Sequence, residues 1–172
     1  VQQELRPGVG LNVGYFRTWF GNYTFTQNLL TTPADYDPFC VTVPVDARIP
    51  GGGGNQLCGL YDIKPAKFGL ADNVVVPIPE QTSVFNGVDV TTNMRLPYGV
   101  FVTGGLSVGR TVTDNCAIGK INSPQTLFCR VTPPWGALTQ VKFAGVVPIP
   151  GDVRLSVTFQ NTSGIPRTGS FV

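Results

Sequence analysis

Cysteine is the residue type with the clearest chemistry in this chain of 172 residues. Its four cysteines form two close pairs in the sequence, and the chain has no Cys-x-x-Cys motif and no histidine, so a zinc site would lack its usual ligand set. Pairing of nearest neighbours would close two short, flexible loops. Although four cysteines permit three connectivities, we predict the disulfides Cys40–Cys58 and Cys116–Cys129. Persistent disulfides imply an oxidising, extracytoplasmic compartment.

Acid–base catalysis has few candidate residues. Without histidine, a serine or cysteine nucleophile lacks its usual general base, and only carboxylate chemistry remains. Asp35 and Asp37 are close in sequence, but they lie among turn-forming residues and are typical of a solvated turn. With Asp46 and Asp62 they offer the oxygen ligands that calcium takes, but their spacing matches no calcium-binding loop. We therefore predict a protein that is not an enzyme and has no cofactor and no metal site.

A Gly-rich segment at 104–111 is close to the phosphate-binding pattern G-x-x-x-x-G-K-[ST]. Arg110 stands where the motif has lysine, and the segment alternates as a strand does, whereas the motif needs a loop that enters a helix. Glycines on a strand, which let a neighbouring backbone or a bulky ring approach, explain this segment better.

Two Asn-x-Ser/Thr triplets, at Asn22 and Asn161, fit the acceptor pattern for N-glycosylation. Each falls near the end of a predicted strand, where a sugar would fit. A pattern of three common residues has little specificity in a chain so rich in Asn and Thr. Asn22 and Asn161 are therefore candidate glycosylation sites.

The composition narrows the classes of partner. Charged residues make up 13% of the chain, about half the usual share for a soluble domain, and 21 Gly and 15 Pro are present. A surface so poor in charge suits contact with lipid, with other copies of the chain or with glycan. The net charge of +2, without a basic cluster, predicts no nucleic-acid partner. No apolar run of about eighteen residues is present, so no transmembrane helix is predicted.

Alternation of apolar and polar residues is the main structural pattern, and helical periodicity is nearly absent. Residues 153–160 alternate Val, Leu, Val and Phe with Arg, Ser, Thr and Gln, which predicts a strand with one apolar and one polar face. The same pattern at 84–96 and 100–108, joined by a turn at 97–99, predicts a β-hairpin. A second hairpin is predicted from 139 to 161 across 148–152. Residues 11–25 add one or two strands, with a turn or bulge at 21–22.

We predict one all-β domain over residues 1–172, built from antiparallel amphipathic hairpins with long loops at about 27–80 and 113–138. The long loops hold all four cysteines, and loops of that length either carry function or build substructure of their own. Short turns at one end and long, disulfide-stapled loops at the other are typical of outer-membrane barrels. The strands of a soluble sandwich alternate in the same way. The pattern therefore fits a barrel segment and an open sandwich that needs strand complementation equally well.

A series of short segments runs through nearly the whole chain: VGYFRTWFGN at 13–22, TPADY at 32–36, FC at 39–40, LCGLYD at 57–62, FNGVD at 85–89, GRT at 109–111, DNC at 114–116 and FC at 128–129. The series resembles the β-barrel of TonB-dependent outer-membrane receptors, most closely the Oar-like proteins with a carboxypeptidase-regulatory-like domain. This resemblance implies a bacterial outer-membrane protein with lipid around it and a role in transport. Receptors of this type have a plug domain and about twenty-two strands, and roughly six strands cannot close that circle. The resemblance therefore implies a segment of such a barrel, paired with further strands, or a separate protein built from the same strands.

A second hypothesis comes from the strand edges. Unpaired edges recruit other strands, so the chain is alternatively a secreted, glycosylated subunit of an extracellular fibre or pilus that self-assembles by strand exchange. Residues 5–15 or 167–172 would then be the donor strand, and other copies of the chain would be the partners. Both hypotheses place a structural or transport protein at the cell surface.

Overall fold

The computed structural model describes residues 1–49 and 51–164, and these residues form an all-β protein with antiparallel pairing, as the sequence predicts. No helix in this part of the chain is long and apolar enough to cross a membrane. The strands are β1 (Gln2–Arg6), β2 (Val9–Phe20), β3 (Tyr23–Asn28), β4 (Tyr36–Thr42), β5 (Gln56–Ile63), β6 (Asn73–Ile78), β7 (Thr82–Arg95), β8 (Phe101–Asp114), β9 (Arg130–Val131), β10 (Gln140–Ile149) and β11 (Val153–Thr162). The 3-10 helices are η1 (Pro33–Asp35), η2 (Pro65–Lys67), η3 (Pro97–Gly99), η4 (Cys116–Lys120) and η5 (Trp135–Leu138).

The chain divides into two compact units. We call the first the sheet unit; it comprises Val1–Trp19, Val84–Val112 and the described residues from Thr132 onward. We call the second the loop unit; it comprises Phe20–Ser83 and Thr113–Val131. The loop unit therefore contains most of the two stretches for which the sequence predicts long loops.

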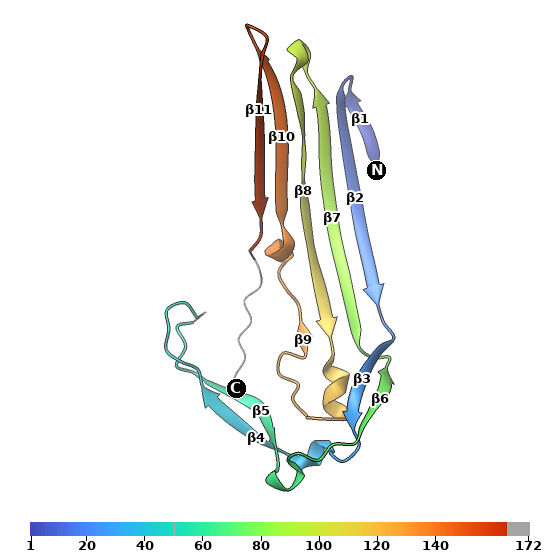
Figure 1. Ribbon diagram of the computed structural model, residues 1–172, viewed down its shortest axis with the longest axis vertical. Coiled ribbons are helices and arrows are strands. Elements are labelled where there is room, and N and C mark those ends of the chain that lie inside the picture. Colours follow the sequence, from blue (N-terminus) through green and yellow to red (C-terminus); the bar gives the residue numbers. More distant parts are fainter. Residues whose placement is uncertain (50, 165–172) are drawn as a thin grey trace. The chain divides into compact units, whose positions relative to one another are not determined.

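The sheet unit is one antiparallel sheet in the strand order β1-β2-β7-β8-β10-β11 (Figure 1). Both predicted hairpins are present: β7 and β8 join through η3, and β10 pairs with β11 from Gln140↔Thr162 to Ile149↔Val153. Strands β8 and β10 also pair, from Phe101↔Val146 to Ser107↔Gln140. Strand β1 was not predicted, because QQELR carries a single apolar residue and shows no alternation.

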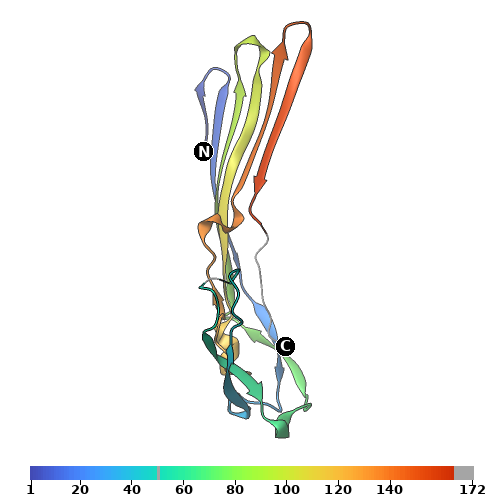
Figure 2. The same ribbon diagram turned by 90° about the vertical axis from the view of Figure 1, so that its left-hand side faces the viewer.

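This sheet has no apolar core of its own. Apart from η5, whose Trp135 stacks on Arg110, no other element of the sheet unit covers either of its faces in Figure 1 or in the turned view of Figure 2. Among the described residues, Val9 and Ile78 are the only buried apolar side chains, and on β11 the exposed fraction is 52% for Leu155 and 58% for Val157. A folded domain of this size normally buries a contiguous cluster of apolar side chains. The apolar side chains of this sheet therefore remain largely exposed in the described part of the chain.

Glycine lets β8 lie close to both of its neighbours. A Cβ on Gly104 would overlap the carbonyl oxygen of Lys142 in β10, and a Cβ on Gly105 would overlap that of Val90 in β7. Farther along, a Cβ on Gly109 would lie 2.9 Å from the ring of Phe85. The Gly-rich segment 104–111 therefore lies within a strand, and its glycines admit backbone and a ring, as the sequence analysis favours.

Gly105→Ala is expected to destabilise the protein by roughly 1–3 kcal/mol, because the added methyl group must push the backbone of β7 away. The measurement is the midpoint of urea unfolding of the folded chain. Gly10→Ala is the matched control, since the nearest atom to a Cβ there is the Asn93 carbonyl oxygen at 3.8 Å, an ordinary contact. Equal losses for the two variants would refute the proposed close approach of β8 to β7.

The loop unit builds two small sheets: β4–β5 lies within the first predicted loop, and β3–β6 joins the two ends of that loop. Strand β3 pairs with β6 from Tyr23↔Ile78 to Asn28↔Asn73, and β4 pairs with β5 from Tyr36↔Ile63 to Thr42↔Gln56. Inside the second predicted loop, the short strand β9 pairs with the last two residues of β8. Proline and a register shift between Phe39 and Cys40 interrupt the alternation of β4, which is why the sequence pattern did not reveal this strand.

Candidate functional site

One surface of the sheet unit, which we call the apolar face, is continuous across the strands. The register sets Val157 of β11 opposite Gly145 of β10, and Gly145 opposite Val102 of β8. Because side chains alternate along a strand, every second residue shares this face. On β11, β10 and β8 the face consists of Val153, Leu155, Val157, Phe159, Val141, Phe143, Gly145, Val147, Ile149, Val102, Gly104, Leu106 and Val108.

Hydrogen bonds extend the apolar face to β7 and β2. Ser107 Oγ of β8 donates a hydrogen bond to Asp89 Oδ1 of β7, so these two side chains share the face opposite the apolar face. Because side chains alternate along a strand, Val88 and Val90, the neighbours of Asp89, lie on the apolar face. Tyr15 Oη donates to Asn86 Oδ1 at 2.7 Å, so these two side chains lie on the same face. Asn86 is two residues from Val88 on β7, so Tyr15 and every second residue of β2 counted from it lie on the apolar face. The members on these two strands are Val88, Val90, Thr92, Met94, Leu11, Val13 and Tyr15.

The apolar face carries no Asp, Glu, Lys or Arg over this described area. On β10 the alternation from Val141 to Ile149 covers nearly the whole of a ten-residue strand. A tilted strand needs about 9–11 residues to cross a bilayer. On β2 and β8 the first charged residues of this face beyond Tyr15 and Val108 are Arg17 and Arg110, each two positions farther along. The apolar face is therefore uncharged over about the length of one ten-residue strand.

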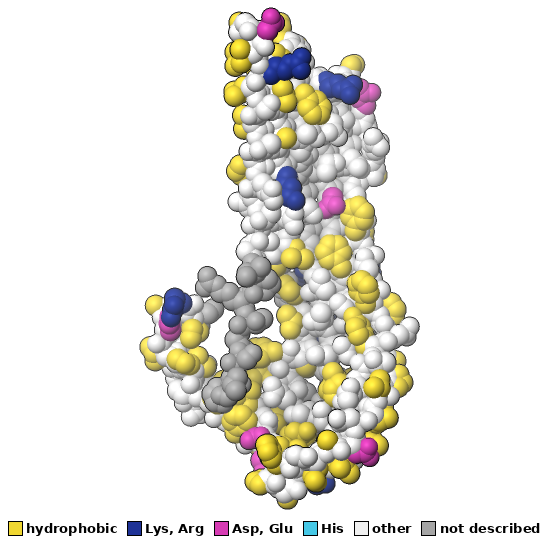
Figure 3. Space-filling model, in the orientation of Figure 1, with side chains coloured by type: hydrophobic (Ala, Val, Ile, Leu, Met, Phe, Trp, Pro, Cys, Tyr) yellow, Lys and Arg dark blue, Asp and Glu magenta, His cyan; other side chains and the backbone are white. Residues whose placement is uncertain are grey.

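The opposite surface, which we call the polar face, carries side-chain hydrogen bonds and charges, together with the rings of Phe16, Phe85 and Phe101. The Ser107–Asp89 bond measures 2.5 Å, and Thr103 Oγ1 donates to Asn93 Oδ1 at 2.6 Å, so two side-chain bonds link β8 to β7. Figure 3 shows charged side chains scattered over the strands of the sheet unit. On β10 and β11 the polar face consists of Gln140, Lys142, Ala144, Val146, Pro148, Arg154, Ser156, Thr158, Gln160 and Thr162.

Both predicted disulfides are present in the loop unit. Cys40 of β4 is bonded to Cys58 of β5, and the two residues are direct partners in the ladder. Cys116, at the start of η4, is bonded to Cys129. Among the described residues no cysteine is free. The two disulfides indicate that the chain folds in an oxidising, extracytoplasmic compartment.

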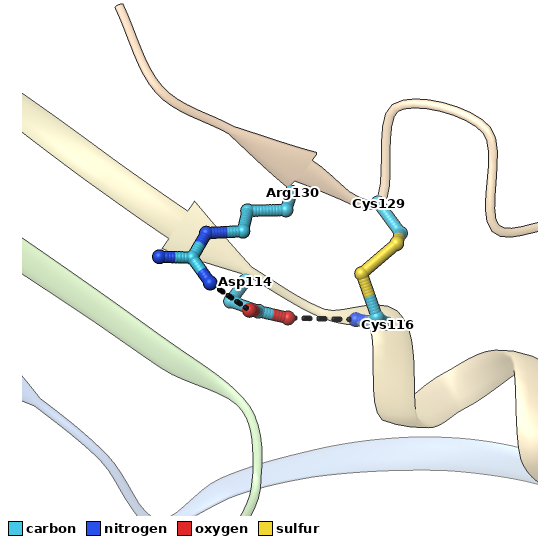
Figure 4. Close-up of a disulfide and its surroundings, with 4 residues drawn as sticks. All are labelled: Asp114, Cys116, Cys129 and Arg130. Carbon is cyan, nitrogen blue, oxygen red and sulfur yellow. Dashed lines mark hydrogen bonds and ion pairs between the residues drawn. A yellow bond between two sulfur atoms is a disulfide. The ribbon is translucent and has the colours of Figure 1, made fainter.

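The disulfide Cys116–Cys129 is supported by its neighbours (Figure 4). The Asp114 carboxylate accepts a hydrogen bond from the backbone N–H of Cys116 at 3.1 Å and forms an ion pair with Arg130 at 3.6 Å. The backbone N–H of Asn115 donates to the carbonyl of Cys129 at 3.0 Å. Backbone pairing and the cross-link thus hold the same two segments together.

The four aspartates considered as calcium ligands do not form a cluster. Backbone and hydroxyl groups of Thr32 donate to Asp35 at 2.9 Å, which lowers the pKa of the Asp35 carboxyl below its usual value. The guanidinium of Arg48 donates to Asp46 and lowers the pKa of that carboxyl in the same way. In the described chain no group of three or more His, Cys, Asp and Glu side chains comes together.

Both glycosylation candidates are exposed, as a sugar acceptor must be. Asn22 follows β2 with a positive φ of 57°, and residues 21–22 are an irregular link between β2 and β3. Asn161 lies near the end of β11, opposite Val141.

Of the two candidate donor strands, the structure describes only the first. Residues 5–15 belong to β1 and β2, which pair with each other, so this segment is already used within the chain. The other candidate, 167–172, lies outside the described residues.

The arrangement offers two extended surfaces of opposite character. The alternation on single strands is evident from the sequence, but the bonds that connect the strands, such as Ser107–Asp89 and Tyr15–Asn86, are not. Nor does the sequence predict the stacking of Arg110 on Trp135, whose ring centroid lies 4.7 Å from the guanidinium carbon. Comparisons with protein-family models, with curated proteins and with solved structures found no match to this chain, so the functional argument depends on these surfaces.

Proposed function

We propose that the chain forms part of a bacterial outer-membrane β-barrel of the TonB-dependent receptor type and has no enzymatic role. The observation that supports this proposal best is the contrast between the two faces of one uncovered sheet. The apolar face is uncharged and exposed, and it would contact lipid. The polar face, with Lys142, Arg154 and the Asp89–Ser107 bond, would face the barrel interior.

The connections also fit a barrel. The turns β1–β2, β7–β8 and β10–β11 are short, whereas β2–β7 and β8–β10 are joined through the loop unit. In an antiparallel sheet successive connections alternate between the two ends, so all short turns are at one end and both long connections leave from the other. Outer-membrane barrels have this asymmetry, with the longer loops outside the cell. The disulfides in those connections suit that exterior.

The two edge strands of the sheet indicate which partner the chain would have in a membrane. In the described part of the chain β1 and β11 have no second neighbour. Inside a bilayer every backbone polar group must be hydrogen-bonded, so an open edge does not persist there. The sheet would therefore continue into further strands, supplied by additional sequence or by other copies of the chain.

A fibre subunit at the cell surface is the second candidate function, and β11 favours it. This strand has an unbroken register with β10, all ten of its residues are exposed, and it contains no proline. Such a long, regular edge is a template for another strand. Strand exchange between copies would satisfy it without a membrane.

Detergent dependence tests the proposal and separates the two candidates. The purified full chain should show β-sheet circular dichroism and a discrete size in micelles, and it should aggregate when the detergent is removed. Regular filaments in detergent-free buffer, seen by negative-stain microscopy, would favour the fibre subunit. A discrete soluble monomer would contradict both candidate functions.

A further inference from the structure

Two arginines lie at one rim of the apolar face. Arg17 follows Tyr15 by two positions on β2, and Arg110 follows Val108 by two positions on β8. The Ser107–Asp89 and Thr103–Asn93 bonds set the register of β7 and β8, which places Arg110 opposite Asn86.

Tyr15 bonds to the same Asn86, so Arg17 and Arg110 lie on the strands to either side of this amide. Adjacent strands are about 4.8 Å apart, and the backbones of the two arginines are therefore roughly 10 Å from each other.

The guanidinium of Arg110 is held in place by an aromatic ring. Its central carbon lies 4.7 Å from the centroid of Trp135, and its Nε is buried without a hydrogen-bond partner among the described residues. None of the ion pairs in the described chain involves Arg17 or Arg110. The structure thus presents two cations that no carboxylate of this part of the chain neutralises.

Aromatic side chains surround this rim. Tyr15, Trp19 and Trp135 are all exposed, with Trp19 at 58%. Tyr and Trp concentrate at the level of lipid headgroups, because their rings are apolar while their polar atoms stay hydrated. A cation that stacks on such a ring is positioned where the hydrocarbon ends and the phosphates begin.

We propose that Arg17 and Arg110 form a binding site for the phosphate of an anionic lipid headgroup. The proposal rests on the membrane location proposed above. A guanidinium presents several N–H donors in a plane and pairs with phosphate through two parallel hydrogen bonds. Stacking on Trp135 orders one guanidinium in advance, and the two arginines flank β7 on β2 and β8.

Native mass spectrometry of the full chain, released from a detergent without phosphate and titrated with phosphatidylglycerol, tests the site. The wild type should retain a bound lipid, and Arg17→Gln/Arg110→Gln should bind it at least about tenfold more weakly, because charge-assisted bonds are lost. Arg154→Gln, on the polar face, is the control for loss of a positive charge and should leave the affinity unchanged. Equal binding by the wild type and the double variant would overturn the proposal.

A competition arm identifies the source of the phosphate. Inorganic phosphate at millimolar concentration should not displace the lipid, and full displacement would show a site for free anions instead. Circular dichroism in micelles and co-flotation with vesicles are recorded on each variant. Failure of the wild type to fold in micelles or to float would refute the membrane location itself. Normal insertion without arginine-dependent lipid binding would refute the headgroup site alone.

Discussion

Val157→Arg should weaken the folding of the chain into lipid bilayers by roughly 2–4 kcal/mol, whereas Thr158→Arg should have little effect. Val157 lies near the middle of the apolar face, opposite Gly145, and its neighbour Thr158 lies on the polar face opposite Ala144. An arginine on the lipid side near the midplane costs about this much, and the cost disappears on the interior side. The measurement is the urea dependence of folding into phospholipid vesicles.

The two positions make a closely matched pair. Both are on the edge strand β11, both side chains are exposed, and both substitutions add the same charge and volume. Any general penalty of arginine on β11 therefore cancels in the comparison. Equal effects of the two variants would contradict the assignment of lipid to the apolar face, and so would folding into vesicles that is insensitive to either.

The part of the fold that the sequence revealed is the part where alternation and turn residues agree. In β7–β8 and β10–β11 one face of each strand is apolar, and the connecting residues include Pro97 and Gly151, which favour turns. Strands β4 and β6 remained hidden, because each contains a proline and they pair in the small sheets of the loop unit. Strand β1 remained hidden because it is nearly all polar.

The two candidate surfaces could not be predicted without the register between neighbouring strands. A slip of one residue moves every side chain of a strand to the other face, so alternation on single strands does not determine which faces coincide. The Ser107–Asp89 and Tyr15–Asn86 bonds connect residues 18 and 71 positions apart, and no local pattern predicts such pairs. For the same reason the sequence does not show that Arg17 and Arg110 lie near each other, and only the folded sheet brings them together.

Removal of the disulfide Cys40–Cys58 should open the β4–β5 hairpin while the rest of the chain stays folded. The described residues of the loop unit contain two buried side chains, Thr31 and Ile78, so apolar packing contributes little to their stability. Closure of a loop with a sequence separation of 18 stabilises the folded state by about 3 kcal/mol in the chain-entropy description. Cys40→Ser/Cys58→Ser should therefore make the hairpin open about a hundredfold more often.

Hydrogen exchange of the folded chain in micelles measures this opening. Backbone amides of β4 and β5 should lose about two orders of magnitude of protection, while those of β8 and β10, which pair within the sheet unit, keep theirs. Cys116→Ser/Cys129→Ser is the matched control: it removes a link of separation 13 and should leave β4 and β5 protected. A loss of protection that is uniform over all strands would contradict the independent role of this cross-link. A Cys40–Cys116 link in non-reducing peptide maps would refute the pairing on which the prediction depends.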